Sequence, residues 1–129
     1  MGFHRLKYKK KNSQDMIDLS TQFMNVMAKR RSVREFSDED IPDIVLENII
    51  RTAMSAPSGA NKEPWQFSVV KDKTVKKKIR KAAEAEEKFF YKERATEEWL
   101  KDLNKFETDW RKPFLEKAPA LIVVFRQSY

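Results

Sequence analysis

Arg30-Arg31-Ser32-Val33-Arg34 places three guanidinium groups within five residues. A guanidinium can donate two parallel hydrogen bonds to one phosphate, so a cluster of this kind suits the dianionic phosphate of a mononucleotide. Taken alone, the cluster has a second interpretation, in which its cations stabilise the negatively polarised carboxyl end of the preceding helix. The cluster therefore indicates a phosphate site only when a further segment supports it.

A second segment, Ala56-Pro57-Ser58-Gly59-Ala60-Asn61-Lys62-Glu63-Pro64-Trp65, follows after an interval long enough for one helix. Pro57, Gly59 and Pro64 interrupt regular structure and leave backbone groups exposed. Gly59 lacks a Cβ, so the chain can approach a flat ring closely at this position. The two segments together predict a flavin site, in which the first holds the phosphate and the second lies against the ring.

The composition restricts the remaining chemistry. The chain has 129 residues, of which 40% are hydrophobic, and this is the size of one ordinary domain with a core. It contains no cysteine, which excludes a disulfide framework, a thiolate nucleophile and a cysteine-based metal site. Its single histidine, His4, argues against a His-rich metal site and a Ser-His-Asp triad. We therefore expect no metal centre.

The formal net charge is +7, and much of it lies near the amino terminus. The cations there are Arg5, Lys7, Lys9, Lys10 and Lys11. They predict a flexible basic arm over residues 1–12, either solvated or in contact with a membrane or nucleic acid; we favour the solvated arm and expect no nucleic-acid partner. No apolar run approaches about 18 residues, so we expect a soluble, cytoplasmic chain, membrane-anchored only if a native amino-terminal anchor has been lost.

Apolar residues at steps of three and four predict four helices. We expect them over residues 13 to about 29, about 40 to 55, 72 to about 91, and about 95 to 106 or beyond. The apolar positions of the first are Met16, Leu19, Phe23, Val26 and Met27. The positions expected to be buried in the second and third are Ile44, Val45, Ile49 and Ile50, then Val75, Ile79, Ala82 and Ala83.

Two segments predict strands, residues 66–70 and 120–125. The second is an uninterrupted apolar run, which is typical of a strand covered on both faces. Two strands alone are marginally stable in water. We therefore expect residues 13–129 to be the amino-terminal part of a larger α+β domain, truncated after its second recognisable strand, with further strands following Tyr129.

The chain resembles the nitroreductase-like flavoproteins and, within them, the iodotyrosine deiodinases. The resemblance runs from about Lys29 to Arg126. The residues that carry it are Arg30-Arg31-Ser32-Val33-Arg34, Arg51-Thr52-Ala53, Ala56-Pro57-Ser58-Gly59-Ala60, Glu63-Pro64-Trp65, Val69-Val70-Lys71-Asp72, and Glu87, Tyr91 and Lys112. Each block alone is moderately specific, whereas all of them in this order are strongly specific.

The resemblance implies an α+β fold with helices flanking a central sheet, and FMN bound at the interface of an intertwined homodimer. It implies that Arg30, Arg31, Ser32, Val33 and Arg34 hold the ribityl phosphate, and that Pro57, Ser58 and Gly59 lie against the isoalloxazine ring. It also implies that the Ala60 N–H donates to the phenolate oxygen of a halotyrosine, whose zwitterion is bound by Glu87, Tyr91 and Lys112.

These residue types suit that substrate. An amino acid offers an ammonium and a carboxylate, so its site needs one anion and one cation, with a neutral donor to fix the angle. Glu87, Lys112 and Tyr91 are such a set, and Glu87 and Tyr91 are four residues apart, on one face of a helix. Since a reduced flavin supplies the electrons, we expect no catalytic side chain.

The function that follows is FMN-dependent reductive deiodination of mono- and diiodotyrosine, with electrons from NADPH or an NADPH-dependent reductase. One alternative is a general NAD(P)H-dependent nitroreductase or flavin oxidoreductase, which needs the arginines but not Glu87, Tyr91 and Lys112. Another is a truncated, noncatalytic partner of a full-length subunit. Without the resemblance, Glu87, Tyr91 and Lys112 would each be interpreted as ordinary solvated surface residues.

Overall fold

The computed structural model describes residues 5–128; residues 1–4, which include His4, and Tyr129 lie outside the described residues. The chain divides into two compact units, one up to Val33 and the other from Arg34 onwards. The predicted basic arm is therefore described only from Arg5, and its described residues up to Asn12 form neither helix nor strand.

The first unit contains one helix, α1 (Ser13–Ala28). The side chain of Asn12 caps its amino end by accepting a hydrogen bond of 2.8 Å from the N–H of Asp15. The predicted apolar stripe is exposed, with Phe23 at 68% of its full accessibility. The reason is that the described part of this unit has no second helix or strand to cover the stripe.

The second unit contains four helices and two strands among its described residues. They are α2 (Asp43–Met54), β1 (Trp65–Val70), α3 (Lys73–Phe89), α4 (Glu97–Asn104), α5 (Phe114–Lys117) and β2 (Leu121–Arg126), with a 3-10 turn η1 (Gly59–Asn61) and a π-helical turn η2 (Phe90–Arg94). The α+β class and both predicted strands are confirmed. The two turns and α5 were not predicted.

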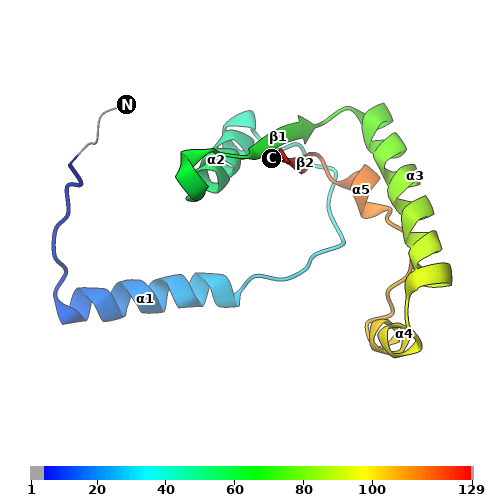
Figure 1. The fold of residues 1–129 in the computed structure, drawn as a ribbon, viewed down its shortest axis with the longest axis horizontal. Coiled ribbons are helices and arrows are strands. Elements are labelled where there is room, and N and C mark those ends of the chain that lie inside the picture. Colours follow the sequence, from blue (N-terminus) through cyan, green and yellow to red (C-terminus); the bar gives the residue numbers. More distant parts are fainter. Residues whose placement is uncertain (1–4, 129) are drawn as a thin grey trace. The chain divides into compact units, whose positions relative to one another are not determined.

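The strands β1 and β2 form an antiparallel pair (Figure 1). Trp65 lies opposite Arg126, and Val70 lies opposite Leu121. The expectation that β2 is covered on both faces is wrong for its second half, because Val124 and Phe125 are exposed. No third strand pairs with β2 within residues 5–128. The expectation of further strands after Tyr129 stays a prediction.

Helix α2 contacts β1, and it buries one side chain, Leu46, which is 5% exposed. The predicted buried positions Ile44, Val45 and Ile49 are instead exposed, and Ile50 is partly buried. A helix that meets one narrow surface buries only the side chains directly over it. The apolar stripe was therefore wider than the face that is covered.

Helix α3 begins after Asp72, whose carboxylate accepts a hydrogen bond of 2.8 Å from the N–H of Val75. The carboxyl end of α3 continues into η2, and the short helix α5 packs against α3 (Figure 1). Of the predicted inward positions, Ile79 and Ala83 are partly buried, whereas Val75 and Ala82 are exposed.

Two findings on the described residues concern membranes and metals. Within residues 5–128, no helix has the length and apolar character needed to cross a membrane. The same residues contain no group of three side chains placed to hold a metal ion.

Candidate functional site

Three of the four predicted substrate-binding residues, Glu87, Tyr91 and Lys112, line one cavity of about 720 Å³ in the second unit, whereas the fourth, Ala60, does not. Glu87 comes from the last turns of α3, Tyr91 from η2, and Lys112 from the segment that leads into α5. Arg34 lines the same cavity. The structure thus brings Glu87, Tyr91 and Lys112 together, although Lys112 lies far from the other two in sequence.

An ion pair joins two of these residues. The Nζ of Lys112 donates to Oε1 of Glu87 at 2.8 Å and to the backbone carbonyl of Asp109 at 3.1 Å. The side chains of Lys112 and Glu87 are 18% and 34% exposed, so the pair is half-buried and remains accessible from the cavity. One anion and one cation therefore stand side by side at this place.

Tyr91 occupies the π-helical turn that follows α3. Turns of this kind are rare and often occur at functional sites. Its hydroxyl lies 3.5 Å from the backbone carbonyl of Thr108, which is long for a hydrogen bond between oxygens. The hydroxyl therefore keeps most of its hydrogen-bonding capacity for a ligand.

Glu84 fixes the backbone at Lys112. Its Oε1 accepts hydrogen bonds from the N–H of Lys112 at 2.9 Å and from Nε of Arg80 at 2.8 Å. Arg80 also donates to Glu116 of α5 at 3.0 Å. The Arg80 guanidinium, and then the Lys112 N–H, hold the pKa of Glu84 below its ordinary value. Sequence reasoning missed Glu84, although its spacing of four from Arg80 was a signal of that pair.

The segment before Lys112 is held by local contacts. Asp109 accepts hydrogen bonds from the backbone N–H and Nε of Arg111, both at 2.7 Å, and these bonds lower the pKa of Asp109. The ammonium of Lys88 lies 3.6 Å from the ring centroid of Trp110, within the range of a cation–π interaction. These contacts restrain the backbone of residues 109–111, which leads into Lys112.

The loop predicted to meet the flavin ring has an unusual backbone. Ala60, Asn61 and Glu63 have φ values of 51°, 52° and 45°, in the left-handed region. This region costs a residue with a Cβ about 1–2 kcal/mol. Strain of this kind is concentrated at functional sites, so it supports a role for the loop in binding.

Hydrogen bonds to Ser58 hold the loop in this shape. The N–H of Asn61 donates to the Ser58 carbonyl at 3.1 Å, and the N–H of Glu63 donates to its hydroxyl at 2.9 Å. Within residues 5–128, the N–H of Ala60 has no acceptor. A Cβ added to Gly59 would meet no atom within 4 Å. The loop thus presents a free donor and an open backbone face.

The structure does not bring every predicted site residue to one place. Pro57, Ser58, Gly59 and Ala60 do not line the cavity that contains Glu87. The arginine cluster is also divided, because Arg30, Arg31, Ser32 and Val33 belong to the first unit and Arg34 to the second.

The guanidinium groups of the cluster differ in their contacts. Nη1 of Arg31 donates to the carbonyls of Ala28 and Arg30, both at 2.8 Å. The side chains of Arg30 and Arg34 form no hydrogen bond or ion pair with any residue in the range 5–128, and both are exposed. Two free cations suit a phosphate, and the open backbone at Gly59 suits a flat ring. The residues present therefore fit FMN.

Known proteins resemble this chain over most of its length. The model of the nitroreductase family matches residues 27–129. An iodotyrosine deiodinase of Haliscomenobacter hydrossis is 55% identical over 116 residues, which are 90% of this chain and 52% of the relative. Iodotyrosine deiodinase 1 of Homo sapiens is 49% identical over 115 residues, which are 89% of this chain and 40% of the relative. The chain thus spans about half the length of these relatives, or less.

Solved structures show the same likeness. A crystal structure of oxidised iodotyrosine deiodinase bound to FMN and 3-iodo-L-tyrosine matches with a TM-score of 0.74 and 38% identity, covering 80% of this chain and 55% of that chain. An FMN-dependent nitroreductase from Clostridium difficile R20291 matches with a TM-score of 0.58 and 27% identity, covering 81% of this chain and 44% of that chain.

Proposed function

This chain belongs to the nitroreductase family, and from this premise we propose that it serves the FMN-dependent reductive deiodination of iodotyrosine. The predicted nitroreductase-like fold and the resemblance to iodotyrosine deiodinases are confirmed. The observation that carries the proposed function is the cavity in which Glu87, Tyr91 and Lys112 meet. Binding of FMN does not require these three residues to lie together, whereas binding of an amino-acid zwitterion does.

FMN, when bound, supplies the electrons: two electrons and one proton replace iodide by hydrogen on the aromatic carbon. We assign the phosphate to the cluster of Arg30, Arg31, Ser32, Val33 and Arg34. The exposed guanidiniums of Arg30 and Arg34 support this assignment, since they have no competing partner among residues 5–128. The segment Pro57, Ser58 and Gly59 would lie against the ring, as the open face at Gly59 allows.

The zwitterion of the substrate exchanges partners with the ion pair already present. Its ammonium binds the carboxylate of Glu87 in place of Lys112, and its carboxylate binds the ammonium of Lys112 in place of Glu87. The hydroxyl of Tyr91, with its long contact to Thr108, donates to the substrate carboxylate and fixes its angle. Each charge keeps an opposite charge beside it, so the exchange avoids leaving an unpaired half-buried ion.

The phenolic end of the substrate is assigned to Ala60. Its N–H has no acceptor among residues 5–128, and donation to the phenolic oxygen would stabilise the phenolate form. Because this loop does not line the cavity of Glu87, we propose that a second copy of the chain completes the site in a homodimer. NADPH, or an NADPH-dependent reductase, is proposed as the electron source. The soluble, cytoplasmic localisation stays a prediction from the sequence.

The second candidate function is a general nitroreductase. The similarity to an FMN-dependent nitroreductase favours it, at 27% identity. Such an enzyme uses the arginine cluster but has no need of an ion pair that matches an amino acid. The third possibility, a noncatalytic partner of a longer subunit, stays a prediction from the sequence.

The test is a titration of FMN with the 129-residue chain, followed by flavin fluorescence and visible absorbance, and repeated with 3-iodo-L-tyrosine. We expect quenching that becomes tighter when iodotyrosine is present. Binding of FMN with no effect of iodotyrosine would favour the general nitroreductase. No binding by this chain, nor by a chain extended beyond Tyr129, would contradict the FMN site itself.

A further inference from the structure

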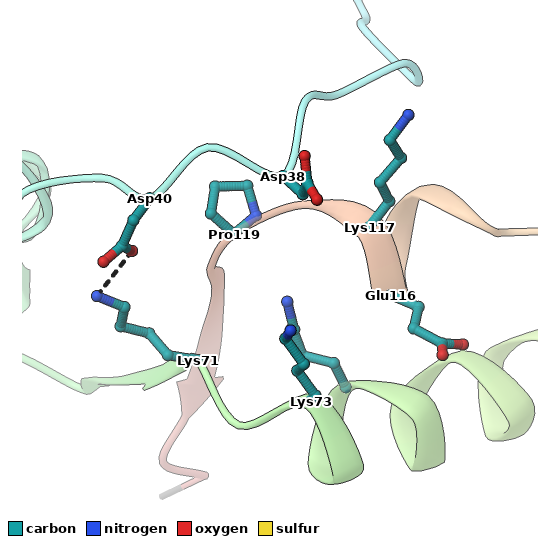
Figure 2. Close-up of a pocket in the computed structure, with 8 residues that line it drawn as sticks. Asp38, Asp40, Lys71, Lys73, Glu116, Lys117 and Pro119 are labelled. Atoms are coloured by element: carbon teal, nitrogen blue, oxygen red, sulfur yellow. Dashed lines mark ion pairs between the residues drawn. The ribbon is translucent and has the colours of Figure 1, made fainter.

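A second cavity, of about 450 Å³, lies between the start of α3 and the segment around Pro119 (Figure 2). Four lysines, three carboxylates and a proline line it. It shares no lining residue with the cavity of Glu87, Tyr91 and Lys112. The function proposed above does not use it.

Two of the three carboxylates already have cation partners. Asp40 pairs with Lys71 at 3.0 Å, as the dashed line in Figure 2 marks, and this contact lowers the pKa of Asp40. Glu116 pairs with Arg80 of α3 at 3.0 Å. Asp38 is the one lining carboxylate that forms no ion pair within residues 5–128.

Three of the four lysines lack a carboxylate partner. Lys73, Lys76 and Lys117 form no ion pair with any residue between 5 and 128. Three unpaired ammonium groups thus stand against one unpaired carboxylate. The lining therefore has an excess of positive charge that the described residues do not neutralise.

Lys76 makes this excess costly. It is 4% exposed, and its Nζ donates to the carbonyl of Ala118 at 2.6 Å. That bond caps the carboxyl end of α5, but it uses one of the three N–H groups of the ammonium and supplies no negative charge. A buried cation without an anion is strongly unfavourable. The capping role therefore explains only part of the position of Lys76.

The other two cations approach from different elements. Figure 2 shows the side chain of Lys73 rising from the start of α3 into the cavity, whereas the side chain of Lys117 points away from Lys73. Both lysines are exposed, so an anion can reach them from solvent. The cavity thus has a buried cation at one point and accessible cations at others.

We propose that this cavity binds a small phosphate-bearing anion, held by Lys76 in the buried part and by Lys73 at the opening. Lysine binds phosphate as a point charge, and a cavity lined by lysines without arginine suits a compact dianion better than a planar carboxylate. The ligand is either inorganic phosphate or a phosphomonoester. This inference is independent of the FMN site, which uses the arginine cluster.

The test is calorimetric titration of the 129-residue chain with inorganic phosphate, and separately with glycerol phosphate. Lys73→Gln replaces an exposed side chain, so the variant should fold. We expect Lys73→Gln to weaken phosphate binding about tenfold, because it removes a charge-assisted interaction. Lys78→Gln removes the same charge from an exposed position of α3 outside the cavity, and we expect no change. Whichever anion binds more tightly identifies the source of the phosphate group.

Three results would overturn the proposal. One is the absence of saturable binding of either anion up to about 10 mM. Another is a loss of phosphate affinity in Lys78→Gln as large as the loss in Lys73→Gln, because equal losses would indicate attraction by net charge alone. The third is loss of phosphate binding in Arg34→Gln with Lys73→Gln unaffected, which would assign the phosphate to the arginine cluster.

Discussion

The ammonium of Lys112 lies 2.8 Å from a carboxylate oxygen of Glu87, although the two residues are 25 positions apart. This contact joins the end of α3 to the segment before α5. It places one positive and one negative side chain next to each other at the cavity. The proposed halotyrosine site depends on this ion pair, which a general flavin site would not need.

Arg34→Gln should weaken FMN binding about tenfold, because a charge-assisted hydrogen bond to phosphate is lost. Fluorescence titration with riboflavin, which lacks the phosphate, provides the control: its affinity should be the same in wild type and variant. Equal weakening of both flavins would show that Arg34 acts on the fold rather than on the phosphate.

Tyr91→Phe should weaken 3-iodo-L-tyrosine binding about tenfold or more through the loss of one hydrogen bond to the charged substrate carboxylate. The free energy of unfolding should change by less than about 0.5 kcal/mol, since the contact with Thr108 is long. Tyr8→Phe, at an exposed position of the first unit, is the matched control and should alter neither quantity. A loss of stability without a loss of affinity would assign Tyr91 a purely structural role.

Glu84→Gln should lower the melting temperature at neutral pH and much less in acid. The pKa of Glu84 is held below 4.5 in the folded chain, so its carboxylate stabilises the fold above that pH and loses this effect as the pH falls through the lowered pKa. Thermal unfolding at about pH 7 and about pH 3 measures the difference. Glu98→Gln, an exposed substitution on α4, is the control. A difference of equal size at both pH values would contradict this role of the carboxylate.

Leu46→Ala should cost about 2–5 kcal/mol of unfolding free energy, because its side chain is 5% exposed. Ile44→Ala, on the same helix at 58% exposure, should cost less than about 1 kcal/mol. Urea denaturation measures both. Similar losses for the two variants would mean that α2 buries a wider face than Leu46 alone.

The sequence allowed the long elements to be predicted, but not their buried faces. Spacing of apolar residues located α1 to within about one residue, since helical periodicity depends on neighbours in sequence. It could not tell that Leu46 is covered and Ile44 is not, because burial depends on which other surface lies against the helix. Helix α5 was missed because four residues are too few to show a period.

In the candidate site too, local spacing predicted part of the arrangement, and contacts between distant segments were not predicted from it. A spacing of four placed Glu87 and Tyr91 on one face, as local geometry requires. The approach of Lys112 came from the resemblance alone, since no local pattern links residues 25 positions apart. The bond from Lys112 to Glu84 and the burial of Lys76 were not predicted for the same reason.

The central claim is that Glu87 and Lys112 bind the zwitterion of an iodinated tyrosine. It is tested most directly by comparing two ligands, 3-iodo-L-tyrosine and 2-iodophenol, which lacks the amino and carboxylate groups. Each is titrated against the FMN-loaded wild-type chain and the FMN-loaded Glu87→Gln variant. Glu98→Gln, loaded in the same way, is the control for loss of one surface charge.

We expect the wild type to prefer iodotyrosine to iodophenol by about a hundredfold, since two charge-assisted contacts are worth at least about 3 kcal/mol together. In Glu87→Gln the preference should fall about tenfold or more, with iodophenol binding unchanged. A preference that is equal in wild type and Glu87→Gln would contradict the account.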